Sequence, residues 1–216
     1  MKYCQLYVFI LLIFLVNFVN VKATNLPLIG KTIYLDPGHG GTDPGAIYKN
    51  IYEKDINLSI CLKLKDTLEQ NGAIVYMTRY DDYDLSINNS SRKKSDLNNR
   101  SRLINDSKSD MYISIHLNSI SSSTWSGAQV FYDDVNQQNK EIASIMQKQL
   151  KKDLKTEREI KEIKNMLLNR KVTIPGVLIE VGFLSNPNDR YLLKSEDYQY
   201  KISKSITNGI ISYFYK

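Results

Sequence analysis

The chain alternates short apolar runs with longer segments of helical periodicity, and this alternation strongly constrains its fold. Apolar runs predict strands over 32–35, 73–78, 111–117, 128–132 and 177–181. Apolar residues spaced three or four apart predict helices over 54–71, 96–107, 136–152 and at the C-terminus, while the polar stretch 80–99 predicts a surface loop. Strands that alternate with helices indicate a single α/β domain, with a mostly parallel sheet covered by helices on both faces. Functional side chains are then expected at the carboxyl ends of the strands.

Residues 1–23 differ from the rest of the chain. Lys2 precedes an apolar run over 6–16, and Val21-Lys22-Ala23 ends the segment with the small residues that an export peptidase reads. This pattern predicts a secretory signal peptide, with an uncleaved N-terminal membrane anchor as the alternative and a buried helix as a weaker one. Residues 24–216 are then predicted to form the folded domain, exported across the cytoplasmic membrane.

The composition is that of a packed soluble domain, because 42% of the residues are hydrophobic and 24% are charged. The formal net charge of +6 suits a polyanionic partner such as cell wall, and it suits an ordinary solvated surface equally well. No dense Lys/Arg cluster with interleaved aromatic residues occurs, so no nucleic acid is expected as a partner.

The chain contains two histidines, and both lie at predicted strand ends. His39 follows the first strand within Asp36-Pro37-Gly38-His39-Gly40-Gly41, and His116 ends the third strand. In a parallel sheet both positions fall on the same edge, so a metal site is favoured over two hydrogen-bonded core histidines.

Glu53 is the candidate third ligand. It precedes Ile56, Asn57 and Ile60 by three, four and seven residues, which places it on the buried stripe of the predicted helix. A buried carboxylate is costly unless a charge compensates it, and a zinc ion would do so. The alternative is a first-turn acid that complements the helix N-terminus.

Glu180 interrupts an otherwise apolar strand and is the candidate catalytic base. Two histidines and one glutamate are a ligand set of catalytic zinc, which leaves a position open for water, and deprotonating that water needs a base. An acid in a strand buried on both faces is expected to have a raised pKa or a charged partner. A structural salt bridge is the alternative.

Two further residues are candidate substrate contacts. Strand alternation puts Asn118 on the face of His116, where it could bind a substrate amide, although an asparagine that begins a loop is an equally good interpretation. Arg100 shares a helix face with Leu97 and Ile104, and an inward arginine more often anchors a carboxylate or carbonyl than it contacts substrate.

Other catalytic chemistries are disfavoured. The sequence has no G-x-S-x-G motif, and the glycines around His39 lack the spacing of a P-loop or a dinucleotide-binding fingerprint. Cys61 adjoins the apolar stripe of its helix and is expected in the core rather than as a nucleophile.

In this order, these motifs resemble the zinc N-acetylmuramoyl-L-alanine amidases of the amidase-3 type, and the resemblance runs from about Lys31 to the C-terminus. Its motifs are Asp36-Pro37-Gly38-His39-Gly40-Gly41, Glu53, Leu97 through Arg100 leading to Ser114-Ile115-His116-Leu117-Asn118, and Ile179-Glu180-Val181-Gly182-Phe183-Leu184-Ser185-Asn186. The resemblance implies a six-stranded mixed sheet and hydrolysis of the amide between N-acetylmuramic acid and L-alanine in peptidoglycan. It also implies one Zn²⁺ per chain on His39, Glu53 and His116, with Glu180 as the catalytic glutamate.

A bare domain behind an export segment is similar to the germination-specific amidases of spore formers. That similarity implies removal of stem peptides from spore cortex so that muramic δ-lactam can form, a site of action such as the forespore intermembrane space, and targeting by a partner such as a membrane-attached lipoprotein. The alternatives are a vegetative autolysin of the same activity and a zinc peptidase that cuts within the stem. A non-catalytic wall-binding module is disfavoured by the intact set of four site residues.

Overall fold

The computed structural model describes residues 26–87, 91–164 and 166–215. The predicted signal peptide or anchor over residues 1–23 lies outside this part of the chain. Among the described helices, none combines the length and the apolar character that crossing a membrane requires.

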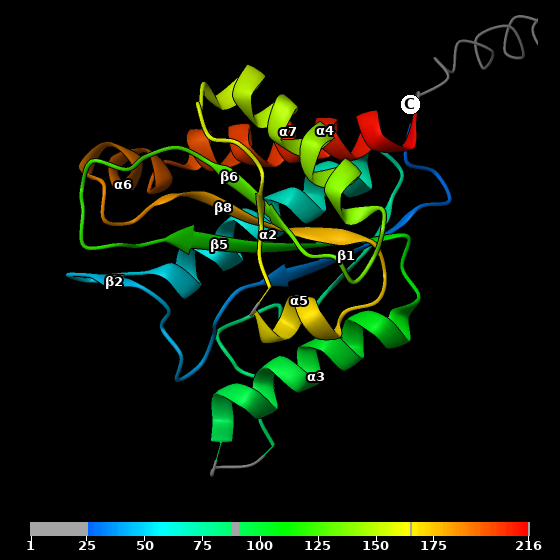
Figure 1. Cartoon of the computed structure of the whole chain (residues 1–216), viewed down its shortest axis with the longest axis horizontal. Coiled ribbons are helices and arrows are strands. Elements are labelled where there is room, and N and C mark those ends of the chain that lie inside the picture. The colour runs from blue at the N-terminus through cyan, green and yellow to red at the C-terminus, as the bar shows by residue number, and fades with distance from the viewer. Residues whose placement is uncertain (1–25, 88–90, 165, 216) are drawn as a thin grey trace, which may run out of the picture.

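A six-stranded sheet forms the centre of the fold (Figure 1). In spatial order its strands are β4 (Ile74–Met77), β1 (Thr32–Pro37), β5 (Met111–Asn118), β8 (Gly176–Phe183), β6 (Gln129–Tyr132) and β7 (Lys161–Glu162). The first four strands are parallel to one another, β6 runs antiparallel to β8, and β7 runs parallel to β6. The prediction of a mixed, mostly parallel six-stranded sheet is therefore confirmed.

Helices cover both faces of this sheet (Figure 1). One face carries α2 (Glu53–Gln70), α4 (Asn139–Leu154) and α7 (Glu196–Phe214), and the other carries α3 (Arg92–Ser107) and α5 (Leu167–Lys171). A short hairpin of β2 (Ile47–Tyr48) and β3 (Ile51–Tyr52) precedes α2, and α6 (Pro187–Leu193) follows β8. The site described below lies on the α3 and α5 side, at the carboxyl ends of β1, β5 and β8.

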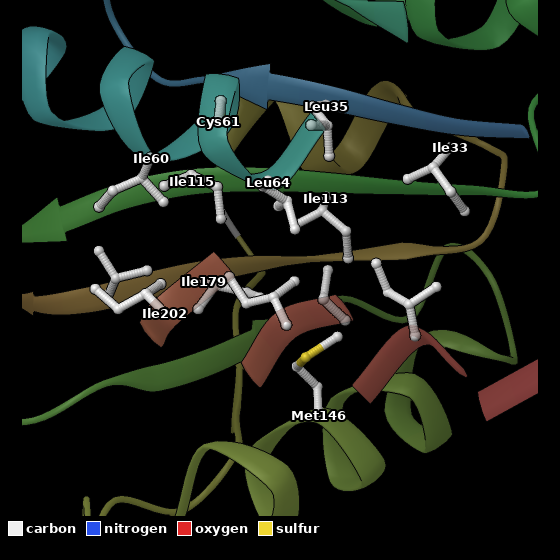
Figure 2. Close-up of a cluster of buried hydrophobic side chains, with 14 of the residues drawn as sticks. Ile33, Leu35, Ile60, Cys61, Leu64, Ile113, Ile115, Met146, Ile179 and Ile202 are labelled. Carbon is white, nitrogen blue, oxygen red and sulfur yellow. The ribbon is translucent and has the colours of Figure 1, made fainter. Parts of the chain in front are cut away.

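Alternation along the central strands divides their side chains between a core and a polar face. In β5, Met111, Ile113, Ile115 and Leu117 point into the main core, where Leu64 of α2 is also fully buried (Figure 2). Burying an aliphatic side chain of this size contributes about 1.5–3 kcal/mol. The intervening β5 residues face α3 and α5, so the apolar positions hold the sheet in place while the polar ones are free for chemistry.

The predicted and observed element boundaries disagree most at α3. The helix begins at Arg92, so the loop prediction for 80–99 is wrong over the last part of that stretch. The first turn of α3 is exposed and polar, so it carries no apolar stripe, and an ion pair from Arg92 to Asp84 ties it to the preceding loop. A helical spacing can be recognised in the sequence only from the part of α3 that is buried against the sheet, which starts at Asp96 and Arg100.

Candidate metal centre

Three predicted ligand residues converge from separate elements. His39 follows β1, Glu53 is the first residue of α2, and His116 lies near the end of β5. Parallel pairing of β1 with β5 aligns Pro37 with Ile115, which brings the two histidines to one edge of the sheet. One donor atom from each of the three side chains lies within 4.8 Å of the others.

The spacing of these donor atoms fits a tetrahedral cation. Oε1 of Glu53 is 3.2 Å from Nε2 of His39 and 3.0 Å from Nδ1 of His116. Ligands about 2.0–2.1 Å from a tetrahedral zinc stand about 3.3 Å apart, so little movement would be needed to bind one. Burial alone would raise the pKa of Glu53, but its contacts with the two imidazoles outweigh burial and hold that pKa well below its usual value. Glu53 is thus ionised and ready to bind a cation.

Asp43 orients the imidazole of His39. Its Oδ2 lies 2.9 Å from Nδ1 of His39, which leaves Nε2 of that ring facing Glu53. A carboxylate behind a histidine in this way fixes the tautomer and raises the basicity of the other ring nitrogen. Although burial lowers the pKa of His39, hydrogen bonds to Glu53 and Asp43 raise it overall. Asp43 was not predicted as part of the site, because an Asp-Pro-Gly run is typical of an ordinary turn.

Backbone groups hold the carboxylate of Glu53 in place. Its Oε2 accepts a hydrogen bond from the N–H of Ala46 at 2.8 Å, and its Oε1 accepts one from the N–H of Leu117 at 3.0 Å. Nδ2 of Asn57, one turn further along α2, donates to Oε1 at 3.3 Å. The burial of Glu53, which is 4% exposed, is therefore compensated by contacts from three elements.

Two glycines leave the space that the side chains of the candidate ligands occupy. A Cβ on Gly38 would lie 2.2 Å from the ring of His116, and a Cβ on Gly45 would lie 2.6 Å from Oε2 of Glu53. Gly45 also has φ +66°, which side-chain-bearing residues rarely adopt. His39 itself has φ 62°, a strained value that persists only where surrounding contacts fix it.

Glu180 lies beside His116 on the adjacent strand. The two residues are register partners in the β5–β8 pairing, and both line one cavity with His39 and Glu53. Oε2 of Glu180 is buried and has no hydrogen-bond partner within the described part of the chain. Burial raises the pKa of Glu180, as does the charge of Glu53, while the two histidines lower it, and the net result is a pKa of about 7. The carboxyl group can therefore exchange a proton near neutral pH.

The cavity above these residues has a volume of about 520 Å³. α3 supplies Leu97 and Lys93 to its wall, and α5 supplies Leu168. Asn118 also lines the cavity and is half-buried, in keeping with its predicted place near His116. Such a cavity can take an extended polar substrate with apolar parts.

Arg100 is buried beneath this cavity and is held by protein groups. Its Nε donates to Asp96 at 2.8 Å, its Nη1 donates to Asp36 at 2.9 Å and to the carbonyl of Pro37, and its Nη2 donates to the carbonyl of His39 at 2.6 Å. These contacts favour the anchoring interpretation over a substrate contact, since every guanidinium nitrogen already has a protein acceptor.

Asp36 and Arg79 complete the support of the loop that carries His39. Asp36 accepts hydrogen bonds from Thr78 and Ser114 as well as from Arg100, and these contacts lower its pKa although burial would raise it. The buried Arg79 donates to the carbonyls of Pro37 and Gly38. Both residues were missed as supports of the site, because their partners are distant in sequence and no local pattern marks them.

Comparison with known proteins finds amidases among the relatives of this chain. The family model described as N-acetylmuramoyl-L-alanine amidase matches residues 33–212. A germination-specific N-acetylmuramoyl-L-alanine amidase of Bacillus subtilis is 46% identical over 216 residues, covering 95% of this chain and 91% of the relative.

Solved structures agree with this result. The CwlD amidase of Clostridioides difficile, solved in complex with the GerS lipoprotein, is 41% identical and superposes with a TM-score of 0.80 over 86% of this chain and 98% of that one. An N-acetylmuramoyl-L-alanine amidase of Clostridium difficile 630 is 34% identical, with a TM-score of 0.78 over 86% of this chain and 97% of that one. Both fold and sequence are therefore shared with these proteins.

Proposed function

The chain belongs to the N-acetylmuramoyl-L-alanine amidase family, and from this premise we propose that it is a zinc enzyme that acts on spore cortex. As a member of that family it hydrolyses the amide that joins N-acetylmuramic acid to L-alanine. The observation that carries the proposal is the convergence of two imidazoles and a carboxylate, with Glu180 beside them. His39, Glu53 and His116 would hold the zinc, and Glu180 would be the catalytic base.

The donor set suits zinc better than a harder cation, since two of its three donors are imidazole nitrogens. Zinc in such a site supplies a Lewis acid that polarises a carbonyl and lowers the pKa of a water to about 7. Asp43 keeps the ring of His39 in the ligating tautomer, and Glu53 contributes the negative charge that offsets the cation.

Glu180 carries the proton through the reaction. Its carboxylate accepts a proton from the attacking water and then donates it to the nitrogen of the departing L-alanine. A pKa raised to about 7 by burial suits both halves of this cycle, because the group is then neither too weak a base nor too weak an acid at neutral pH. Oε2 of Glu180 has no hydrogen-bond partner among the described residues, so a lone pair is available for the water.

Asn118 and Arg100 have different proposed roles. The side chain of Asn118 lines the cavity next to His116 and would hydrogen-bond an amide of the substrate. Arg100 would act indirectly, by holding the carbonyl of His39 and so the position of that ligand. Asn118 is therefore a substrate-contact candidate and Arg100 a positioning residue.

The cortex role is supported by the germination-specific relative from B. subtilis. We propose that removal of stem peptides leaves muramic acid free to be converted to muramic δ-lactam. This role requires export, which the signal peptide or anchor predicted over residues 1–23 would provide, and it places the domain of residues 24–216 in an extracytoplasmic compartment such as the forespore intermembrane space. The CwlD amidase was solved with the GerS lipoprotein, and we propose a membrane-attached lipoprotein partner here too.

Product analysis tests the proposed activity and its setting. Digestion of purified cortex should release peptides that begin with L-alanine and leave glycan with unsubstituted muramic acid, as detected by mass spectrometry. Vegetative peptidoglycan should be cut more slowly than cortex. Shortened stems still attached to muramic acid would instead identify a peptidase, and faster cutting of vegetative wall would identify an autolysin.

Metal removal should abolish activity and lower the thermal stability of the domain. A ligand present at about 1,000 times its Kd stabilises the folded state by about 4 kcal/mol. For a domain of this size, chelation should then lower the thermal midpoint by about 10 °C. Metal analysis should find one zinc per chain, and zinc added back should restore both activity and midpoint. Full activity in a chain with negligible metal content would contradict the zinc assignment.

A further inference from the structure

Trp125, the only tryptophan of the chain, is part of an aromatic and cationic stack outside the metal centre. The guanidinium carbon of Arg158 lies 4.5 Å from the centroid of the Trp125 ring and 4.8 Å from that of Phe183. Phe183 is buried, whereas Trp125 is 50% exposed. Arg158 therefore contacts a buried ring and a half-exposed one, and a cation–π interaction joins its guanidinium to each of them.

The guanidinium of Arg158 has no carboxylate partner among the described residues. Its Nε is buried and has no hydrogen-bond acceptor in that part of the chain. An arginine in contact with two aromatic rings loses hydration, so donors left without acceptors are costly. A ligand that offers oxygen acceptors would therefore bind favourably to this guanidinium.

The loop that carries Trp125 is fastened to the rest of the fold. The side chain of Asn186 donates to the carbonyl of Ser123 at 2.8 Å, and the N–H of Gly127 donates to Asp189 at 2.8 Å. These contacts lie on both sides of Trp125 in the sequence. The indole is thus presented in a fixed position rather than on a mobile loop tip.

A strand irregularity brings this stack to the side of the sheet where Glu180 lies. His116 pairs with Glu180 and Asn118 pairs with Phe183, so β8 has one more residue than β5 between these two pairs. The extra residue restores Phe183 to the face of Glu180. At about 3.3 Å per residue, Phe183 lies about 10 Å along the strand from Glu180, which is roughly the length of a disaccharide.

We propose that Trp125 and Arg158 form a subsite for the glycan strand next to the muramoyl residue that is cleaved. A pyranose ring has an apolar C–H face that would stack on the exposed indole, and its hydroxyl and acetamido oxygens would accept hydrogen bonds from the guanidinium of Arg158. The inference rests on the proposed function, because it takes the muramoyl group to lie at Glu180. It assigns the preference for a strand over a single muramoyl peptide to these two residues.

Tryptophan fluorescence tests binding without turnover. The full chain carrying Glu180→Gln is titrated with a peptidoglycan tetrasaccharide that bears stem peptides, with excitation where tyrosine does not absorb. The emission can come only from Trp125 and should change with saturation. A single muramoyl peptide should leave the emission unchanged. Unchanged emission with the tetrasaccharide would overturn the proposal.

Kinetics of Trp125→Ala test the same subsite in the active enzyme. KM for glycan strands should rise about five- to tenfold relative to KM for a single muramoyl peptide, and Trp125→Phe should recover most of the loss. Tyr200→Ala is the matched control, since Tyr200 lies on α7, away from the site, is 42% exposed and pairs with Lys63 of α2. Equal KM changes for both substrates would overturn the subsite. Absence of cleavage by the wild-type chain would instead count against the proposed function alone.

Discussion

Replacing Glu180 with glutamine should lower amidase activity by about 10²- to 10⁴-fold, the usual contribution of a positioned general base. Glutamine has nearly the shape of glutamate but cannot accept and return a proton. Because Glu180 is not among the three converging donors, the variant should bind the proposed zinc as well as the wild type does. The measurement is stem-peptide release from muropeptides at saturating substrate, beside metal analysis of the same sample.

A matched substitution separates this effect from a loss of charge on the sheet. Glu162→Gln changes an exposed glutamate on the edge strand β7 and should leave activity unchanged. The thermal midpoint of Glu180→Gln should equal or exceed that of the wild type, since a neutral group replaces a buried carboxyl whose Oε2 has no hydrogen-bond partner in the described part of the chain. Activity within about threefold of wild type would remove Glu180 from the mechanism, and loss of zinc would make it a ligand rather than a base.

The strands and the main helices could be predicted from the sequence because their buried faces give apolar residues a regular spacing. β5 shows this, since its odd-numbered residues enter the core and its even-numbered residues face α3 and α5. The same pattern placed His116 at the end of one strand, Glu180 within another, and Glu53 on the buried side of the helix that is α2. These are positions where one local pattern, read against one topology, is enough.

Elements without a regular spacing of apolar residues were not predicted. The two-residue strands β2, β3 and β7 and the five-residue α5 are too short for an apolar stripe to repeat. The pairing of Arg100 with Asp36 could not be predicted from the sequence either, because Asp36 lies 64 positions away and meets Arg100 only through tertiary packing. Asp43 was missed for a different reason: the run Asp43-Pro44-Gly45 is typical of an ordinary turn, so its composition does not mark Asp43 as a partner of His39.

The second large effect concerns the buried pair of Arg100 and Asp36. Both side chains are 1% exposed, and their ion pair is 2.9 Å long. Removing one partner of such a pair leaves a buried charge uncompensated and typically lowers the free energy of unfolding by about 3–5 kcal/mol. Arg100→Met should therefore unfold at a much lower urea concentration than wild type, whereas Arg102→Met, an exposed change on the same helix, should not.

The cause of this loss can be separated from a simple loss of packing. If the unpaired charge of Asp36 is responsible, the double variant Arg100→Met with Asp36→Asn should be less destabilised than the sum of the two single variants. The pH dependence gives a second test. Without Arg100, burial is expected to raise the pKa of Asp36, so the folded variant takes up a proton more readily than the unfolded chain as the pH falls. The stability deficit of Arg100→Met should then shrink as the pH approaches the usual carboxyl pKa of about 4. A deficit that is constant across this range and additive in the double variant would show that Arg100 contributes volume and not charge.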